Sequence, residues 1–161
     1  MAVRRLLLAA LAWAAPAMAA LTPSSPGDGE ARGPKAAAGV LYATVDRVDL
    51  KQYRELFAPA AAIAAVKHGR ELPDGTVLTL ARFAVQLDLA GKPVNDGNDR
   101  VVKDDLIGYF VMRKQRGAWA FASFTADGAV EPEADLAACA ACHQRAAADF
   151  VFSRDRMLAM D

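Results

Sequence analysis

The strongest alternation of apolar and polar residues lies in the middle of the chain, over residues 76–88. One face of this strand pattern is mainly apolar and consists of Val77, Thr79, Ala81, Phe83, Val85 and Leu87. Residues 106–114 and 119–124 predict two further strands, joined by a turn at Arg116 and Gly117. Loop residues fill 91–99. The middle of the chain therefore predicts an antiparallel meander.

A helical pattern precedes the meander. Pro59 suits a first helical turn, residues 60–67 are strong helix formers, and Gly69 suits the position after a helix end. We expect His68, which lies at that end, to interact with the last carbonyls of the helix in preference to binding iron. Residues 40–50 mix apolar and charged side chains and predict either a short helix or a strand.

The stretch with the clearest chemistry is Cys139-Ala140-Ala141-Cys142-His143, because Cys-x-x-Cys-His is the attachment pattern of a c-type haem. Residues 133–148 predict a helix rich in alanine, with Asp135 as its N-cap. On one helix face both thiols can reach the two vinyl groups of one porphyrin, and His143 can bind the iron as proximal ligand. We predict one covalently attached haem c, in an α+β fold of an antiparallel meander, flanking helices and a C-terminal haem-binding helix.

Two other interpretations of the cysteines are open at this point. In an oxidising compartment Cys139 and Cys142 could form a plain disulfide. They could also belong to a zinc site together with His143, but such a site needs about four ligands. The only other histidine is His68, and the chain has no third cysteine, so the sequence favours haem.

The first residues predict export. Arg4 and Arg5 form a charged start, residues 6–15 are apolar but too few to span a bilayer with ease, and residues 17–19 form a small-residue cleavage pattern. We expect a signal peptide over 1–19, a flexible leader over 20–38 and a single haem c domain over 39–161. A retained membrane anchor is the alternative. The mature protein is expected in a bacterial periplasm, because c-type haem is attached outside the cytoplasm.

The charge balance argues against two kinds of partner. The chain has 19 basic and 19 acidic side chains, so its formal net charge is zero. Proteins that bind nucleic acid or an anionic membrane surface usually carry an excess of positive charge. We therefore expect neither nucleic-acid binding nor binding to a membrane surface.

The late position of the motif excludes two haem folds. Small electron-transfer cytochromes carry the motif early and a ligand methionine much later, whereas here only a short stretch follows His143. The helical cytochromes c′ carry it late, but they are four-helix bundles, and residues 76–124 do not predict helices. Met112 lies in a predicted strand, and Met157 and Met160 lie in a polar tail. We therefore predict a five-coordinate iron with an open distal side, which binds small ligands.

Over roughly residues 40–153 the chain resembles the cytochrome P-460 family, which includes the cytochromes c′-beta. Besides the Cys-x-x-Cys-His motif, the matching segments are Arg-Glu-Leu-Phe-Ala at 54–58, Leu-Pro-Asp-Gly-Thr-Val at 72–77, Gly-Tyr-Phe-Val-Met at 108–112, Phe-Thr-Ala-Asp-Gly at 124–128 and Asp-Phe-Val-Phe at 149–152. The resemblance implies an antiparallel sheet with a few helices and a haem c at its edge, usually in a homodimer.

Members of that family with the full site oxidise hydroxylamine and nitric oxide, and they carry a lysine bonded covalently to the porphyrin. Others, similar to cytochrome c′-beta, lack this bond and bind nitric oxide or carbon monoxide in an apolar pocket. By resemblance the lysine falls where this chain has Arg82-Phe83-Ala84, and no lysine occurs between Lys67 and Lys92. The chain is therefore expected to be a member without the cross-link.

The resemblance adds four distal candidates to Cys139, Cys142 and His143, namely Tyr53, Arg54, Phe83 and Ala84. For the two aromatic residues the alternative is core packing. For Arg54 the alternative is a salt bridge at the surface or with a haem propionate. No catalytic residue is identified.

Two functions of different classes follow. The first is a periplasmic haem protein that binds nitric oxide or a similar small ligand, or that exchanges electrons with a periplasmic electron-transfer protein. The second is an oxidoreductase that oxidises hydroxylamine or nitric oxide. The missing strand lysine favours the first. A thiol-redox or structural protein without haem is a third possibility.

Overall fold

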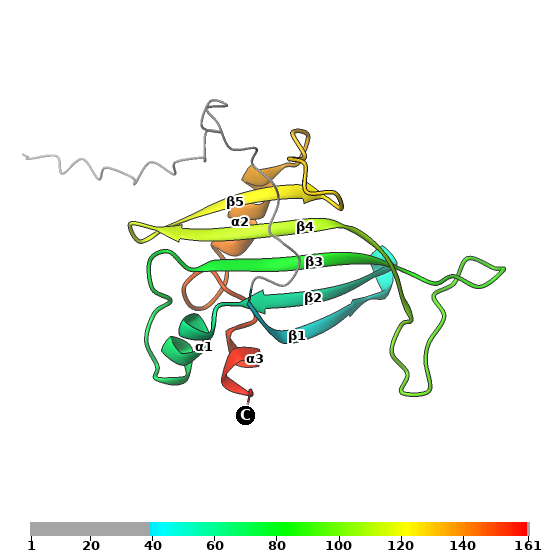
Figure 1. Ribbon diagram of the computed structural model, residues 1–161, viewed down its shortest axis with the longest axis horizontal. Coiled ribbons are helices and arrows are strands. Elements are labelled where there is room, and N and C mark those ends of the chain that lie inside the picture. The colour runs from blue at the N-terminus through cyan, green and yellow to red at the C-terminus, as the bar shows by residue number, and fades with distance from the viewer. Residues whose placement is uncertain (1–38, 161) are drawn as a thin grey trace, which may run out of the picture.

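The computed structural model describes residues 39–160; the expected signal peptide and leader lie outside these residues. Five strands form one antiparallel sheet in chain order: β1 (Val40–Arg47), β2 (Gln52–Ala58), β3 (Val77–Val85), β4 (Lys103–Gln115) and β5 (Ala118–Thr125). A 3-10 turn, η1 (Val48–Leu50), joins β1 to β2. The helices are α1 (Ala60–Lys67), α2 (Leu136–His143) and α3 (Arg154–Leu158) (Figure 1). The predicted α+β class and antiparallel meander are confirmed.

The two N-terminal strands were not clear from the sequence. Residues 40–50 form β1 and η1, and the unassigned residues after them form β2. Along β2, one face carries the charged Arg54 and the apolar Leu56. The other face carries the charged Glu55 between the aromatic residues Tyr53 and Phe57. Because neither face is uniformly apolar, the strand lacks the alternation that identifies a half-buried strand.

The motif helix is shorter than predicted, and it is not the last helix. Asp135 is the N-cap as predicted, and its Oδ1 accepts a hydrogen bond from Ala138 N at 2.8 Å. However, α2 ends at His143 instead of residue 148, and α3 follows it. After His143 the backbone forms turns instead, in which Arg145 N donates to Cys142 O and Ala146 N donates to His143 O, both at 3.1 Å.

The prediction that Met157 lies in a polar tail was also wrong, because Met157 belongs to α3 and is completely buried. It belongs to the larger of two apolar clusters, on the sheet face that carries Leu78 and Trp119. We call this the helix face, because α1 and α3 pack there and α2 contacts β5 there through Phe121. The cluster consists of Ala58, Ala62, Ile63, Val66, Leu72, Leu78, Trp119, Val151 and Met157.

The opposite face of the sheet, called the second face here, carries the smaller cluster of Phe57, Ala81 and Tyr109. This is the face that the sequence predicted to be mainly apolar in β3. The structure shows apolar side chains on both faces of the sheet. The helices cover the helix face, which is not the face that the sequence predicted to be apolar. Within residues 39–160 none of the helices has the length and the apolar character needed to cross a bilayer.

Gly108 of β4 marks a close approach of three strands. It pairs with Arg82 of β3 on one side and with Thr125 of β5 on the other. A Cβ atom at this position would collide with the carbonyl oxygen of Phe124 and would lie 2.9 Å from Arg82 Nη2. A glycine here therefore leaves room for the Arg82 side chain.

We predict that Gly108→Ala lowers the free energy of unfolding by about 1–3 kcal/mol, because the added methyl group forces backbone or Arg82 to move. Gly97→Ala is the matched control, since among residues 39–160, apart from its two chain neighbours, no atom lies within 4 Å of its Cβ position. Urea unfolding of both variants measures the difference. Equal stabilities for the two variants would contradict the close approach.

Candidate haem site on α2

Helix α2 carries both cysteines of the motif as free thiols. Cys139 is half-buried and Cys142 is exposed. Burial raises the pKa of the Cys139 thiol, and the negative charge of Asp135 raises it further. Among residues 39–160, no three His, Cys, Asp or Glu side chains are placed to hold a metal ion together. The raised pKa favours the neutral thiol form of Cys139, which is the form that can add to a vinyl group.

His143 is held by three contacts. Its Nδ1 lies 2.7 Å from the carbonyl oxygen of Phe150. Its ring lies between Phe121 of β5 and Phe152, with both ring centroids 5.4 Å away. A carbonyl oxygen only accepts hydrogen bonds, so Nδ1 carries the proton and Nε2 has the lone pair for a metal. Metal-binding histidines generally donate their other ring N–H in this way.

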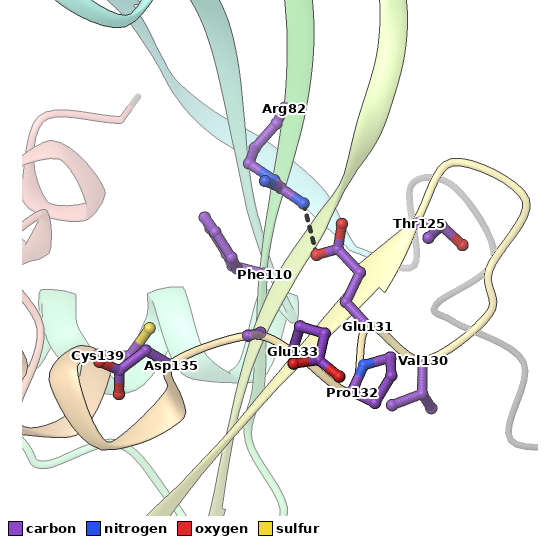
Figure 2. A pocket seen from close by; sticks show the side chains of 10 residues that line it. Arg82, Phe110, Thr125, Val130, Glu131, Pro132, Glu133, Asp135 and Cys139 are labelled. Atoms are coloured by element: carbon purple, nitrogen blue, oxygen red, sulfur yellow. Dashed lines mark hydrogen bonds and ion pairs between the residues drawn. The ribbon is translucent and has the colours of Figure 1, made fainter.

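A pocket of about 530 Å³ lies beside α2, and Cys139 forms part of its wall. Arg82 of β3 and Phe110 of β4 line it from the helix face of the sheet, and residues 130–135 line it from the connection between β5 and α2. Figure 2 shows the Arg82 guanidinium directed towards the Glu131 carboxylate, with Phe110 and Cys139 beside the same space. The volume is typical of sites for small molecules and cofactors.

Arg82 is the main buried charge of this pocket, with a side chain only 12% exposed. Its Nη2 donates to Glu131 Oε2 at 2.9 Å, and its guanidinium carbon lies 4.1 Å from the centroid of the Phe110 ring. Ser123 also donates to Glu131 Oε2. The Nε atom of Arg82 is buried without a hydrogen-bond partner among residues 39–160. A buried donor left unpaired costs about 1–3 kcal/mol, so an acceptor on a bound group would stabilise this arrangement.

Arg54 of β2 lies directly opposite Arg82 on the same face of the sheet. Its Nε and Nη2 donate to Gln52 Oε1 at 3.1 and 2.8 Å. Burial lowers the pKa of Arg54, and the charges of Arg47 and Arg82 add to the effect. Like charges directly opposite each other destabilise a sheet. An anionic group bound between the two arginines, such as a haem propionate, would offset this repulsion.

None of the four distal candidates is among the residues that line this pocket. Ala84 lies two residues from Arg82 on the same face of β3. Tyr53 and Phe83 pair on the second face, with ring centroids 6.4 Å apart, and Phe83 packs against the smaller cluster. For Phe83 this placement supports the core-packing alternative, whereas Tyr53 is half-buried and contacts the Phe83 ring without joining either cluster. The roles of Arg54 and Ala84 stay predictions.

Sequence reasoning missed three pocket residues, Arg82, Phe110 and Glu131. For Arg82 the sequence held a signal, because it is a charged residue within an otherwise apolar stretch of β3. The alternation of side chains along a strand also places Arg82 on the opposite face from Phe83. Phe110 is one of several aromatic residues in β4, and nothing local distinguishes it. Glu131 reaches Arg82 only through the turn after β5, so no local pattern predicts it.

A helix that carries Cys-x-x-Cys-His, with its histidine oriented to bind a metal, beside a pocket of this size, is the site of a haem-binding protein. The family model of cytochrome P-460 matches residues 37–153, which is most of the chain. The chain therefore belongs to the cytochrome P-460 family and is a haem-binding cytochrome. No curated protein matches its sequence.

Helix α2 depends strongly on its N-cap, because it has eight residues, none of them buried, and short helices are marginal alone. We predict that Asp135→Ala destabilises the helix by about 0.5–2 kcal/mol, because Ala138 N loses its acceptor. Hydrogen exchange of the α2 amides should be faster in this variant. Asp135→Asn is the control, since asparagine also caps helices. Equal exchange in both variants would show that the cap does not hold α2.

Proposed function

We propose that this protein is a periplasmic cytochrome with one covalently attached haem c, which binds nitric oxide or a similar small ligand at an open distal side, transfers electrons, or does both. The observation that carries the proposal is the geometry of His143. Its Nδ1 donates a hydrogen bond to Phe150 O at 2.7 Å. His143 lies on the same helix that presents two free thiols at the attachment spacing. Membership of a haem-binding family supports it.

In this proposal Cys139 and Cys142 hold the haem. Each thiol would add across one vinyl group, so that a carbon–sulfur bond would form and the thiol hydrogen would go to the other vinyl carbon, without any oxidant. His143 Nε2 would bind the iron, and Arg82 Nε and Arg54 would interact with the propionates. When bound, the haem supplies an iron atom with one open position for a small ligand.

The placement of the other candidate ligands supports an open distal side. Met157 is completely buried in the larger cluster, and Met160 and Met112 pack against that cluster. His68 lies at the exposed end of α1, where its Nδ1 is 2.7 Å from Ala64 O. This confirms the predicted interaction of His68 with a helix-end carbonyl. Each of these side chains therefore has a structural role of its own.

A second candidate function is oxidation of hydroxylamine or nitric oxide, and Glu131 is the observation that favours it. Its carboxylate lies in the pocket, where it could accept a proton from a substrate. However, Glu131 Oε2 already accepts hydrogen bonds from Arg82 and Ser123. In addition, Ala84 has no amine to form the bond to the porphyrin. We therefore place the enzyme second.

The partners implied by this function are a small gaseous or nitrogen-oxide ligand and a periplasmic electron-transfer protein. The homodimer implied by the family resemblance is also part of the proposal. Half-buried Phe83, Val111 and Phe124 on the second face of the sheet support it, because a second copy would cover them. Sedimentation of the purified protein measures directly whether it is a monomer or a dimer.

We predict an ordinary c-type haem spectrum, a high-spin ferrous state that binds carbon monoxide, and negligible hydroxylamine oxidation with an artificial electron acceptor. The physical reason is that, within residues 39–160, His68 and the three methionines have other contacts, and that no lysine occurs between Lys67 and Lys92 to bond to the ring. Absorption spectra with and without carbon monoxide, and an acceptor-reduction assay, measure these properties.

The control is His143→Ala. This variant should no longer show the high-spin ferrous spectrum, because it lacks the proposed iron ligand. A low-spin ferrous spectrum that carbon monoxide leaves unchanged would reveal a sixth protein ligand and contradict the open site. A strongly red-shifted main band, or hydroxylamine turnover that His143→Ala abolishes, would establish the oxidoreductase instead.

A further inference from the structure

The Asp149 carboxylate joins the segment after α2 to three other parts of the fold. Its Oδ1 accepts from Lys114 Nζ at 2.8 Å and from Trp119 Nε1 at 3.1 Å, and its Oδ2 accepts from Leu72 N at 2.8 Å. The side chains of Asp149 and Lys114 are only 8% and 5% exposed. Burial alone raises the pKa of Asp149, but the three hydrogen bonds outweigh it and lower the pKa. Asp149 is therefore a carboxylate at neutral pH.

The backbone at this point is strained. Asp149 and the next residue, Phe150, both have positive φ, although neither is glycine. Such a conformation is uncommon for aspartate and unusual for a bulky residue such as phenylalanine. It persists only where surrounding contacts determine it. The bonds of Asp149 provide these contacts on one side, and the buried side chain of Val151 provides them on the other.

The strained segment determines where the Phe150 carbonyl points. This carbonyl accepts the hydrogen bond from His143 Nδ1 at 2.7 Å, at the short end of the usual range. A histidine that donates its Nδ1 proton in this way is a stronger electron donor through Nε2. The conformation of residues 149 and 150 therefore controls both the orientation of His143 and its strength as a ligand.

We infer that Asp149 is a positioning residue for the axial histidine: anchored by Lys114 and Trp119 of the sheet, it holds the Phe150 carbonyl against His143 Nδ1. This inference rests on the proposed function, in which His143 binds the haem iron. It goes beyond that function because it assigns control of the iron to a buried carboxylate that lies outside the motif and outside the pocket lining.

The test uses the purified haem-loaded protein and two variants, Asp149→Ala and Asp149→Asn. Asparagine tolerates the left-handed conformation and keeps one acceptor oxygen, so it is the conservative variant. Resonance Raman spectroscopy of the ferrous protein measures the iron–histidine stretching frequency, and a redox titration measures the midpoint potential. We expect Asp149→Ala to lower the frequency and raise the potential, with a smaller shift in both for Asp149→Asn.

The control for stability alone is Val66→Ala, which removes a buried side chain of α1 from the larger cluster. It should lower the melting temperature but leave the frequency and the potential unchanged. If Asp149→Ala does not fold, Asp149→Asn and Trp119→Phe, which removes a single donor, still test the inference. Unchanged frequencies in the folded variants, or an equal shift in Val66→Ala, would overturn it.

The two claims fail in different ways. If the wild-type protein shows no iron–histidine band that depends on His143, then the proposed function fails, and the positioning role fails with it. If this band is present in the wild type but does not respond to substitution of Asp149, then only the positioning role fails.

Discussion

The interaction on which the C-terminal part of this fold depends is the buried contact between Asp149 and Lys114. Removing one partner of a buried ion pair typically costs about 3–5 kcal/mol, out of about 5–15 kcal/mol for a whole domain. Because Trp119 and the Leu72 amide share the same carboxylate, the contact joins β4, β5 and the loop before β3 to the segment after α2. It also fixes two left-handed residues, each of which costs about 1–2 kcal/mol.

The motif helix benefits from this anchoring more than from its own packing. None of its eight residues is buried, and it packs against β5 of the sheet. It is held at one end by the Asp135 cap and at the other by His143, which contacts Phe121, Phe152 and the Phe150 carbonyl. A helix placed in this way leaves its cysteines accessible for attachment of a cofactor. The pocket next to it contains an arginine nitrogen that is unpaired within the described part of the chain, which is the kind of local inconsistency that functional sites show.

The sequence predicted what depends on local patterns. The Cys-x-x-Cys-His spacing, the Asp135 cap, the Gly69 helix end and the three central strands all follow from residues close together in the chain. It could not predict the end of α2, because the alanines after His143 favour a helix locally, whereas the backbone there forms turns. It also could not place Glu131 beside Arg82, since a turn brings the two together. Tyr53 and Phe83 show the same limit, because only the strand register fixes their face.

The central claim is that α2 holds one haem covalently through Cys139 and Cys142, with His143 as axial ligand. Mass spectrometry of the protein, produced together with the machinery for c-type haem attachment, tests it most directly. The account predicts an increase by the mass of one haem, located on the proteolytic peptide that contains both cysteines. A chain without added haem, or a peptide that has lost two hydrogens through a disulfide between Cys139 and Cys142, would contradict it.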